Sequence, residues 1–463
     1  MKVILIFPAI IETIADGSLA SVEKNNWFID RLKKCFLGFG ETGFIPPMAL
    51  LSLAAVTPPE VEVTIVDERI QPIDYHAEAD LIGISIITIT ACHSYDIAAR
   101  FRRRGIPVVF GGIHATVLPE ESLQHGDAVV IGEGERVWPR LLEDAMEGKL
   151  KRTYQSQKMV HLETLPPPPF HILKYPERYI GTKVVRASRG CPYRCSFCTT
   201  GTSIGRAYRK RPVEDIIREI ESRPGRYLCF LDDNLGVDRR WAKALFRALQ
   251  PLKLKWYGAV SLNALEDEGF IREAARAGCI YLGIGFESIN AQTLKAMNKR
   301  KTNNPDRYRT IIRNIHRHGI SIVGYFLMGY DTETAQDYRR LGDFLLQTGI
   351  DIPSISALTP YPGSPICRRL EKEGRILHRQ WNHYYSRWWD LAFQPLQMTR
   401  EAVYENYLEL IERLFSVNAV LKRCLPHLIR FNLISLIYVL QHGYYQKKVL
   451  AEERAFQPRN ESK

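Results

Sequence analysis

Five short apolar runs in the first 150 residues constrain the fold of this chain more than any other feature. They are rich in β-branched residues, and segments long enough for helices separate them. Apolar strands that alternate with helices predict a parallel sheet covered on both faces. We therefore predict a flavodoxin-like (Rossmann-type) α/β domain over residues 1–150. The runs cover residues 2–7, 61–66, 81–89, 107–110 and 128–131.

A second series of six apolar runs begins at residue 184 and again alternates with helical segments. The helix after the first run opens at Pro212, with Glu214 and Asp215 in its first turn, which is a sound helix-start signal. Six strand–helix units predict a partial, TIM-like (β/α)6 barrel over residues 184–370, with its active face at the carboxyl ends of the strands. The runs cover residues 184–187, 227–231, 255–261, 280–285, 321–328 and 352–358.

Two regions outside these series complete the predicted organisation. Residues 151–183 form a linker that contains four consecutive prolines within residues 165–170, a composition typical of stiff spacers. Residues 371–463 form an aromatic-rich and helical C-terminal region, with one helix from residue 399 and another over about residues 425–440. The second of these helices has basic flanks, so we expect it to pack on the barrel or to lie on a membrane surface.

Three cysteines directly follow the first run of the second series. Cys191, Cys195 and Cys198 have the spacing Cys-x-x-x-Cys-x-x-Cys, and Gly190 and Pro192 beside them favour a loop. Three thiolates on one short loop can hold three corners of a cubane iron–sulfur cluster, which leaves the fourth iron open to a small molecule. A structural zinc site or plain core cysteines are the alternatives, but no second Cys or His pair follows at zinc-finger spacing.

The segment RGCPYRCSFCTT, residues 189–200, resembles the signature of radical S-adenosylmethionine (SAM) enzymes, including the aromatic Phe197 before the last cysteine. The resemblance implies that the open iron of a [4Fe–4S] cluster binds SAM, and that the reduced cluster cleaves SAM to a 5′-deoxyadenosyl radical. Cys191, Cys195 and Cys198 are then both the metal ligands and the catalytic residues. The resemblance also implies an electron donor such as flavodoxin or ferredoxin.

Turns after three later runs of the barrel add to this resemblance. A carboxylate and a hydroxyl can hydrogen-bond a ribose, and glycine allows a tight turn beside a ligand. The family places its SAM contacts at these strand ends. The residues expected in these roles are Asp232, Asp233 and Asn234 at the amino group of SAM, Gly285, Glu287 and Ser288 at the ribose, and Gly329 at the adenine.

Other polar residues near the strand ends have more than one interpretation. Asp331 or Thr332 can cap the helix that follows the fifth run. Arg206, Arg209 and Arg211 follow the cysteine loop and could pair a carboxylate of the substrate or of SAM. We expect at least two of these three arginines to be solvated instead.

The strand ends of the N-terminal domain are rich in glycine. Ligands of doubly wound sheets bind beyond the carboxyl ends of the strands, and glycine lets the backbone approach a flat or phosphate-bearing ligand closely. Tight turns without a ligand would explain any one of these glycines equally well. The candidate cofactor contacts at these ends are Ser85, Gly111, Gly112, Gly132 and Glu133.

The order of the segments FIPPMALLSLAA, VEVTIVDE, ADLIGIS, VVFGGIHATVLPEE and VVIGEGE resembles the cobalamin-binding domain that precedes many radical SAM domains. Classical cobalamin domains supply a cobalt-ligating His from an Asp-x-His-x-x-Gly motif after the first strand, but residues 9–45 contain no His. His76 matches that motif poorly, and we expect His93 and His114 to be solvated or core residues. We therefore expect cobalamin to bind without a protein His ligand; a vestigial domain is the alternative.

The amino-acid composition limits the cellular compartment and the binding partners that we expect for this chain. Nine cysteines in 463 residues do not indicate a secreted disulfide scaffold, and a cluster needs a reducing compartment, so we expect a cytoplasmic protein. No run of 18 or more apolar residues is present, so no membrane-spanning helix is predicted. The net charge of +12 suits an anionic substrate, a membrane surface or nucleic acid. No RNA-binding module is recognisable, so we expect no nucleic acid partner and leave peripheral membrane contact open.

The two resemblances together imply a cobalamin-dependent radical SAM enzyme, related to the anaerobic Mg-protoporphyrin monomethyl ester cyclase-type proteins. Most characterised relatives are methyltransferases, in which one SAM supplies the methyl group through cobalamin and a second SAM supplies the radical. The alternatives are a radical SAM oxidoreductase or cyclase, with or without cobalamin, and an iron–sulfur RNA-modifying protein. A lipid, a tetrapyrrole-like ring or another small molecule is the expected substrate.

We expect Cys195→Ala to abolish SAM cleavage, because two remaining thiolates cannot hold the cluster that the three-cysteine loop predicts. The measurement is the yield of 5′-deoxyadenosine after anaerobic reconstitution with iron and sulfide and reduction with dithionite. Cys92→Ala, outside the loop, serves as the matched control and should retain cleavage. Wild-type yields from the Cys195→Ala variant would contradict the assignment of the loop.

Overall fold

The computed structural model of this chain describes residues 1–10, 44–179, 183–385 and 391–429, together with residues 436–437, 439–440, 442–444, 446–447 and 450. The chain divides into two compact units. The described part of the first unit comprises residues 1–10, 44–179, 183–225 and 359–385. The described part of the second unit comprises residues 226–358 and the described residues from 391 onward.

The first unit contains a parallel sheet of six strands in the order β2-β1-β3-β4-β5-β6. The first five strands confirm the predicted flavodoxin-like sheet, whose order 2-1-3-4-5 is that of a doubly wound fold. The sixth strand was not predicted and lies within the segment assigned to the linker. The strands are β1 (Lys2–Phe7), β2 (Glu62–Asp67), β3 (Leu81–Ser85), β4 (Val108–Gly111), β5 (Ala128–Ile131) and β6 (Thr153–Gln155).

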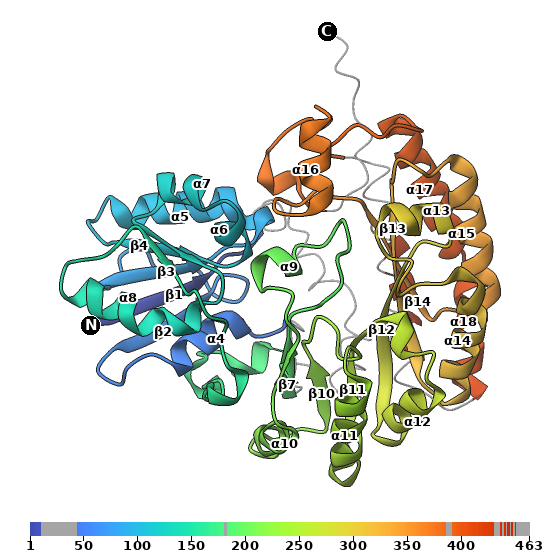
Figure 1. Cartoon of the computed structure of the whole chain (residues 1–463), viewed down its shortest axis with the longest axis horizontal. Helices are drawn as coiled ribbons and strands as arrows, with labels where there is room; N and C mark the ends of the chain where they lie inside the picture. The colour runs from blue at the N-terminus through green and yellow to red at the C-terminus, as the bar shows by residue number, and fades with distance from the viewer. Residues whose placement is uncertain are drawn as a thin grey trace. The chain divides into compact units, whose positions relative to one another are not determined.

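Helices cover both faces of this sheet (Figure 1). One face carries α5 (Ala91–Arg102), α6 (Ile113–Val117) and α7 (Pro119–His125), and the other carries α4 (Met48–Ala55) and α8 (Trp138–Met146). The inner strands β1, β3, β4 and β5 are mostly buried, as their continuous apolar runs require, whereas the edge strands β2 and β6 are partly exposed. Because these strands are parallel, the carboxyl ends of β1, β3, β4 and β5 meet at one edge of the sheet.

The second unit contains five parallel strands in the order β14-β13-β12-β11-β10. These strands and the helices on their outer face confirm the predicted alternation of the barrel (Figure 1). The first predicted run of this series is β7 (Lys183–Val185), in the first unit. The strands are β10 (Tyr227–Phe230), β11 (Lys255–Val260), β12 (Cys279–Glu287), β13 (Ser321–Met328) and β14 (Ile352–Ala357). The helices are α11 (Arg239–Leu249), α12 (Glu268–Arg276), α14 (Pro305–Arg317) and α15 (Ala335–Thr348).

The cap of α15 differs from the expectation that Asp331 or Thr332 begins this helix. Thr334 is the N-cap and forms a reciprocal capping box with Asp337. Thr332 instead hydrogen-bonds the hydroxyl of Thr293 at 2.9 Å. Asp331 and Thr332 do not cap the helix, because they lie in the turn between β13 and the N-cap.

The C-terminal region is helical, as predicted, but its second helix starts earlier. The described helices are α17 (Arg400–Leu414), which packs on α15, and α18 (Val417–Ile429). Residues 430–435, and Trp388 and Trp389 of the aromatic stretch, lie outside the described residues. The exposed apolar side chains of α18 are Val417, Leu421, Leu425, Leu428 and Ile429.

None of the helices in the described part of the chain is both long enough and apolar enough to cross a membrane. Peripheral membrane contact by the C-terminal helices stays a prediction.

Asp351 joins α18 to the body of the second unit. One carboxylate oxygen contacts His316 Nε2 at 2.9 Å and accepts the Ile322 N–H at 2.7 Å, and the other contacts His427 Nε2 of α18 at 2.6 Å. Only 4% of this side chain is exposed. Burial opposes ionisation, but the hydrogen bonds from His316 and His427 outweigh it and lower the pKa of Asp351 to about 2.

We expect Asp351→Ala to reduce the free energy of unfolding by about 3 kcal/mol, because it leaves the buried His427, the half-buried His316 and a buried N–H without their partner. In the wild type this contribution is present above the ordinary pKa of 3.8 and is lost as the pH falls toward about 2. Urea unfolding followed by circular dichroism measures both effects. Asp343→Ala removes the exposed partner of Arg413 and should change stability by less than about 1 kcal/mol. Equal losses from the two variants would contradict this assignment.

Candidate functional site

A two-strand ladder closes the base of the cysteine loop. β8 (Ser188–Arg189) pairs in antiparallel fashion with β9 (Arg209–Lys210), so the chain between them leaves and returns at one point. Gly190 begins the loop with a φ of 86°, and a Cβ there would collide with the Ala207 carbonyl oxygen. This close approach requires glycine at the first position of the loop.

The loop also forms hydrogen bonds with residues 363 and 366, far away in the sequence. The Ile366 N–H, at the start of α16 (Pro365–Lys372), donates to the Ser196 carbonyl oxygen at 2.8 Å. The Thr202 hydroxyl donates to the Gly363 carbonyl oxygen, also at 2.8 Å. Two segments far apart in the sequence therefore fix the conformation of the loop that carries the cysteines.

The three cysteines of the loop are half-buried, reduced thiols. Cys198 N donates to the Cys195 carbonyl oxygen at 3.3 Å, which forms a turn between the second and third cysteines. Among the residues that the structure describes, no three His, Cys, Asp or Glu side chains already form a metal-binding group. The donor set itself, three thiols within eight residues and a half-buried Phe197 beside the last, fits an iron–sulfur cluster.

A cavity of about 260 Å³ opens at the carboxyl ends of β3, β4 and β5 in the first unit. Its floor is apolar and reaches down between the sheet and helices α4 and α8, where Leu5, Leu50 and Trp138 line it. Apolar cavities with a few polar groups at the rim are typical of cofactor sites. The five predicted contacts all line this cavity: Ser85, Gly111, Gly112, Gly132 and Glu133. Their contact with a cofactor stays a prediction.

Two glycines at the rim have backbone conformations that favour glycine. Gly112 has a φ of 94°, and a Cβ there would lie 2.6 Å from the Ile86 carbonyl oxygen. Gly132 has a φ of 81° and faces open space, and its N–H donates to the Thr116 hydroxyl at 3.0 Å. Backbone therefore forms the rim where a side chain would otherwise block it, which fits a broad, flat cofactor such as cobalamin.

The wall of this cavity also includes residues that flank the cysteine loop, which the sequence analysis did not foresee. Arg186 and Arg189 precede the loop cysteines, and Ser203 and Ile204 follow them. Only the folding of residues 183–210 against the first sheet brings them to the cavity, so no local sequence pattern could have identified them.

The arginines after the loop are paired rather than solvated, which corrects the expectation for Arg209 and Arg211. Arg209 donates to Glu133 at 2.6 and 3.0 Å, and Arg211 pairs with Glu219. Burial alone would raise the pKa of Glu133, but the hydrogen bond from Arg209 and the charge of Arg189 lower it below its ordinary value.

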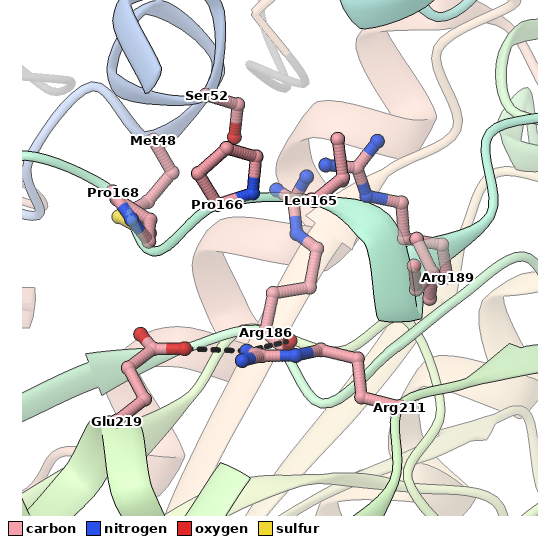
Figure 2. A pocket seen from close by; sticks show the side chains of 10 residues that line it. Met48, Ser52, Leu165, Pro166, Pro168, Arg186, Arg189, Arg211 and Glu219 are labelled. Atoms are coloured by element: carbon pink, nitrogen blue, oxygen red, sulfur yellow. Dashed lines mark hydrogen bonds and ion pairs between the residues drawn. The ribbon is translucent and has the colours of Figure 1, made fainter. Parts of the chain in front are cut away.

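A smaller cavity of about 40 Å³ lies beside the proline-rich segment. Figure 2 shows the side chains of Arg186 and Arg189 directed toward Leu165 and Pro166, while Arg211 pairs with Glu219 below them. Arg186 and Arg189 line both cavities. The proline-rich segment therefore lines a cavity of the first unit, although Pro166 and Pro167 are exposed.

The predicted contacts to the amino group of SAM lie at the end of β10 in the second unit. Asp232 and Asn234 are buried, and Asp233 is exposed. The Asn234 amide donates to the Ser261 hydroxyl at 3.0 Å and accepts the Ser261 N–H at 3.1 Å. Asn234 therefore joins the ends of β10 and β11, and the contact of these three residues with SAM stays a prediction.

The end of β12 carries the predicted ribose contacts and a strained backbone. Glu287 has a φ of 62°, which is uncommon for a residue with a side chain, and the register to β13 shifts between Gly285 and Glu287. The Glu287 carboxylate folds over Gly285 and pairs with Lys299 at 3.1 Å. Ser288 is buried, and its hydroxyl accepts the Asn290 N–H at 3.1 Å.

A buried carboxyl group that the sequence analysis missed shapes the turn after β13. Glu333 accepts the N–H groups of Gly329 at 2.7 Å and Tyr330 at 3.0 Å with one oxygen, and it is fully buried. Burial raises the pKa of Glu333 to about 8, against the opposing effect of the two N–H donors. The predicted adenine contact Gly329, with a φ of 97°, is thus held by a carboxyl group that is mostly protonated at neutral pH.

The histidines of the first unit lie where the sequence analysis placed them. His76 is exposed in the connection from β2 to β3 and does not line the cavity. His93 contacts the Glu68 carboxylate at 2.8 Å. His114 is a core residue, fully buried, with its Nε2 at 3.1 Å from the Tyr95 hydroxyl.

Two family descriptions match this architecture, one for each series of strands. Residues 185–345 match the Radical SAM superfamily, and residues 42–142 match the B12 binding domain. Residues 364–435 match a third description, the Domain of unknown function (DUF4070).

Curated relatives include two methyltransferases of Chlorobaculum tepidum. Bacteriochlorophyllide d C-12(1)-methyltransferase is 31% identical over 389 residues, which cover 81% of this chain and 84% of that protein. Bacteriochlorophyllide d C-8(2)-methyltransferase is 31% identical over 435 residues, which cover 89% of this chain and 93% of that protein.

Solved structures support the fold. The radical SAM methyltransferase TsrM of Kitasatospora setae, with cobalamin and a [4Fe–4S] cluster bound, matches with a TM-score of 0.61 and 18% identity over 80% of this chain and 75% of that chain. The cobalamin-dependent radical SAM enzyme OxsB matches with a TM-score of 0.68 and 16% identity over 97% of this chain and 72% of that chain. At these identities the likeness extends to the fold alone.

We expect Glu333→Gln to flatten the pH dependence of stability. Between the ordinary carboxyl pKa of 4.5 and about 8, the folded chain keeps a proton on Glu333 that the unfolded chain releases, so stability falls as the pH rises through that window. The glutamine amide oxygen still accepts both N–H groups and does not titrate. Urea unfolding at pH values below, within and above the window measures this. The exposed Glu405→Gln is the control, and an unchanged slope for Glu333→Gln would refute the assignment.

Proposed function

This chain belongs to the family of cobalamin-dependent radical SAM methyltransferases, and we propose that it transfers a methyl group to an unactivated carbon of a tetrapyrrole-like small molecule. The two relatives at 31% identity are named as methyltransferases of bacteriochlorophyllide d, which supports this substrate class. An unactivated C–H bond is not acidic enough for a general base, so methylation there needs a radical. When bound, the [4Fe–4S] cluster, SAM and cobalamin of the family supply the radical and carry the methyl group.

One observation supports the proposal most strongly: the flanks of the cysteine loop and the glycine-rich strand ends line the same cavity. Arg186 and Arg189 reach the cavity from one side of the loop, and Ser203 and Ile204 from the other. A cofactor that fills this cavity therefore touches the polypeptide that holds the cluster cysteines. Such proximity suits a reaction in which two cofactors act on one substrate carbon.

Different residues of this chain would bind the cluster, contact SAM and exclude water. Cys191, Cys195 and Cys198 would hold the cluster and leave one iron open for SAM. The predicted contacts to the rest of SAM lie in the second unit, in the turns after β10, β12 and β13. The apolar floor of the cavity excludes water, which protects reactive species from side reactions.

Partners beyond the substrate follow from the same chemistry. We propose that a small electron carrier such as flavodoxin or ferredoxin reduces the cluster. We also propose a cytoplasmic location, because the thiols of the loop must stay reduced to bind iron.

We expect the reconstituted wild-type chain to transfer a trideuteromethyl group from methyl-deuterated SAM to a chlorophyllide-type acceptor. The assay contains hydroxocobalamin, a low-potential reductant and an acceptor pool, under anaerobic conditions. Mass spectrometry of the acceptors measures methyl transfer, and mass spectrometry of 5′-deoxyadenosine measures SAM cleavage.

The controls separate this function from its alternatives. Omission of hydroxocobalamin should stop methyl transfer, and Cys195→Ala should stop both methyl transfer and 5′-deoxyadenosine formation. Formation of 5′-deoxyadenosine with an oxidised or cyclised acceptor, and no added methyl group, would favour the oxidoreductase or cyclase. Methyl transfer confined to acceptors without a tetrapyrrole ring would refute the proposed substrate class.

A further inference from the structure

We propose that Glu133 is a positioning residue that couples the cobalamin cavity to the iron–sulfur loop, so that each cofactor binds more tightly when the other is present. The proposal rests on the proposed function, because it assumes cobalamin in the cavity and a cluster on the loop. The observation behind it is a buried group of two glutamates and two arginines that spans both places.

Glu133 contacts both strands that close the base of the cysteine loop. Its two carboxylate oxygens accept from Arg189 Nη1 at 3.0 Å and from Arg209 at 2.6 and 3.0 Å. Arg189 and Arg209 are directly paired across the β8–β9 ladder. The Glu133 carboxylate thus joins the two ends of the loop that carries all three cysteines. One of these ends, Arg189, lies two residues before the first cysteine.

The four side chains are largely buried, and the two negative charges of the glutamates balance the two positive charges of the arginines. The exposed fractions of the side chains are 11% for Glu133, 8% for Arg189 and 15% for Arg209. Glu135 adds a second carboxylate, 2.7 Å from Arg189 Nη2 and 8% exposed. Surface ion pairs contribute little, but removal of one member of a buried group leaves the others without compensation. The position of the loop therefore depends on this group.

The same residues form part of the cavity. Glu133, Glu135 and Arg189 line it together with the rim glycine Gly132. Glu133 also accepts the Val160 N–H at 3.1 Å, which ties the rim to the segment after β6. A ligand that fills the cavity therefore contacts Glu133 and Arg189, which hold the base of the loop. Residues that flank the loop cysteines in turn line the cavity.

Coupling between two binding sites is reciprocal. If cluster assembly orders the loop and Glu133 transmits that order to the cavity wall, the cluster must raise the affinity for cobalamin, and cobalamin must stabilise the cluster by the same factor. We expect a factor of about ten, within the range of roughly 5 to 150 that is typical of coupled sites.

The test compares the dissociation constant of hydroxocobalamin for cluster-free and cluster-reconstituted full-length protein, measured anaerobically by absorbance titration. For the wild type, the ratio of the two constants should be about ten. For Glu133→Gln, which keeps the shape but not the charge, the ratio should fall to about one. A merely structural role would weaken binding in both states and leave the ratio unchanged.

Asp144→Asn is the matched control. Asp144 is a buried carboxylate of the same unit that accepts from Tyr154 at 2.9 Å and pairs with Arg140, and it does not line the cavity. For Asp144→Asn, the ratio of the two dissociation constants should match that of the wild type. Glu135→Gln removes one carboxylate from Arg189 but leaves the clamp on both strands, so its ratio should be intermediate. This milder variant also carries the test if Glu133→Gln does not fold.

The outcomes are distinct. A wild-type ratio near one, or equal ratios for the wild type and both glutamine variants, overturns the coupling while leaving the proposed function intact. A wild type that binds neither hydroxocobalamin nor a cluster overturns the proposed function itself.

Discussion

Parallel strands buried between helices send their carboxyl ends to one edge of a sheet, and the rest of this structure depends on that constraint. In the first unit the edge is built from glycine-rich strand ends, so backbone rather than side chains forms the rim of the cavity. In the second unit the corresponding edge carries Asn234, Glu287 and Gly329 at the ends of β10, β12 and β13. Each set of predicted contacts is therefore gathered by topology, although its members are far apart in the sequence.

The cysteine loop depends on a second interaction, the ion pairs at its base. The segment between β8 and β9 contains three glycines and has no regular structure apart from the four-residue helix α9 (Thr200–Ser203). Glu133 and Glu135 restrain its base by pairing with Arg189 and Arg209, whose side chains are only 8% and 15% exposed. The motif Gly-Glu-Gly-Glu at the end of β5 thus acts on the loop as well as on the cavity.

Local strain and unusual protonation are found at the candidate SAM edge. Glu287 adopts a left-handed conformation beside a register shift, and Glu333 is buried with its pKa raised to about 8. Both features reduce stability, and both occur in turns that leave a strand at its carboxyl end. Such features persist where the surrounding structure holds them in place, as it does at binding sites.

The sequence by itself determined the strands, the cysteine loop and the residues that line the cavity rim. It could do so because apolar periodicity and glycine placement act locally along the chain: Ser85, Gly111 and Gly132 follow their strands directly. Strand β6 was not predicted because it has only one apolar residue, Tyr154, which is buried and donates a hydrogen bond to Asp144 at 2.9 Å. The partners of Arg209 and the role of Glu333 were decided only by the tertiary structure. An ion pair between residues 76 positions apart, or a carboxyl group neutralised by burial, depends on what the fold removes from water, and no local pattern records that.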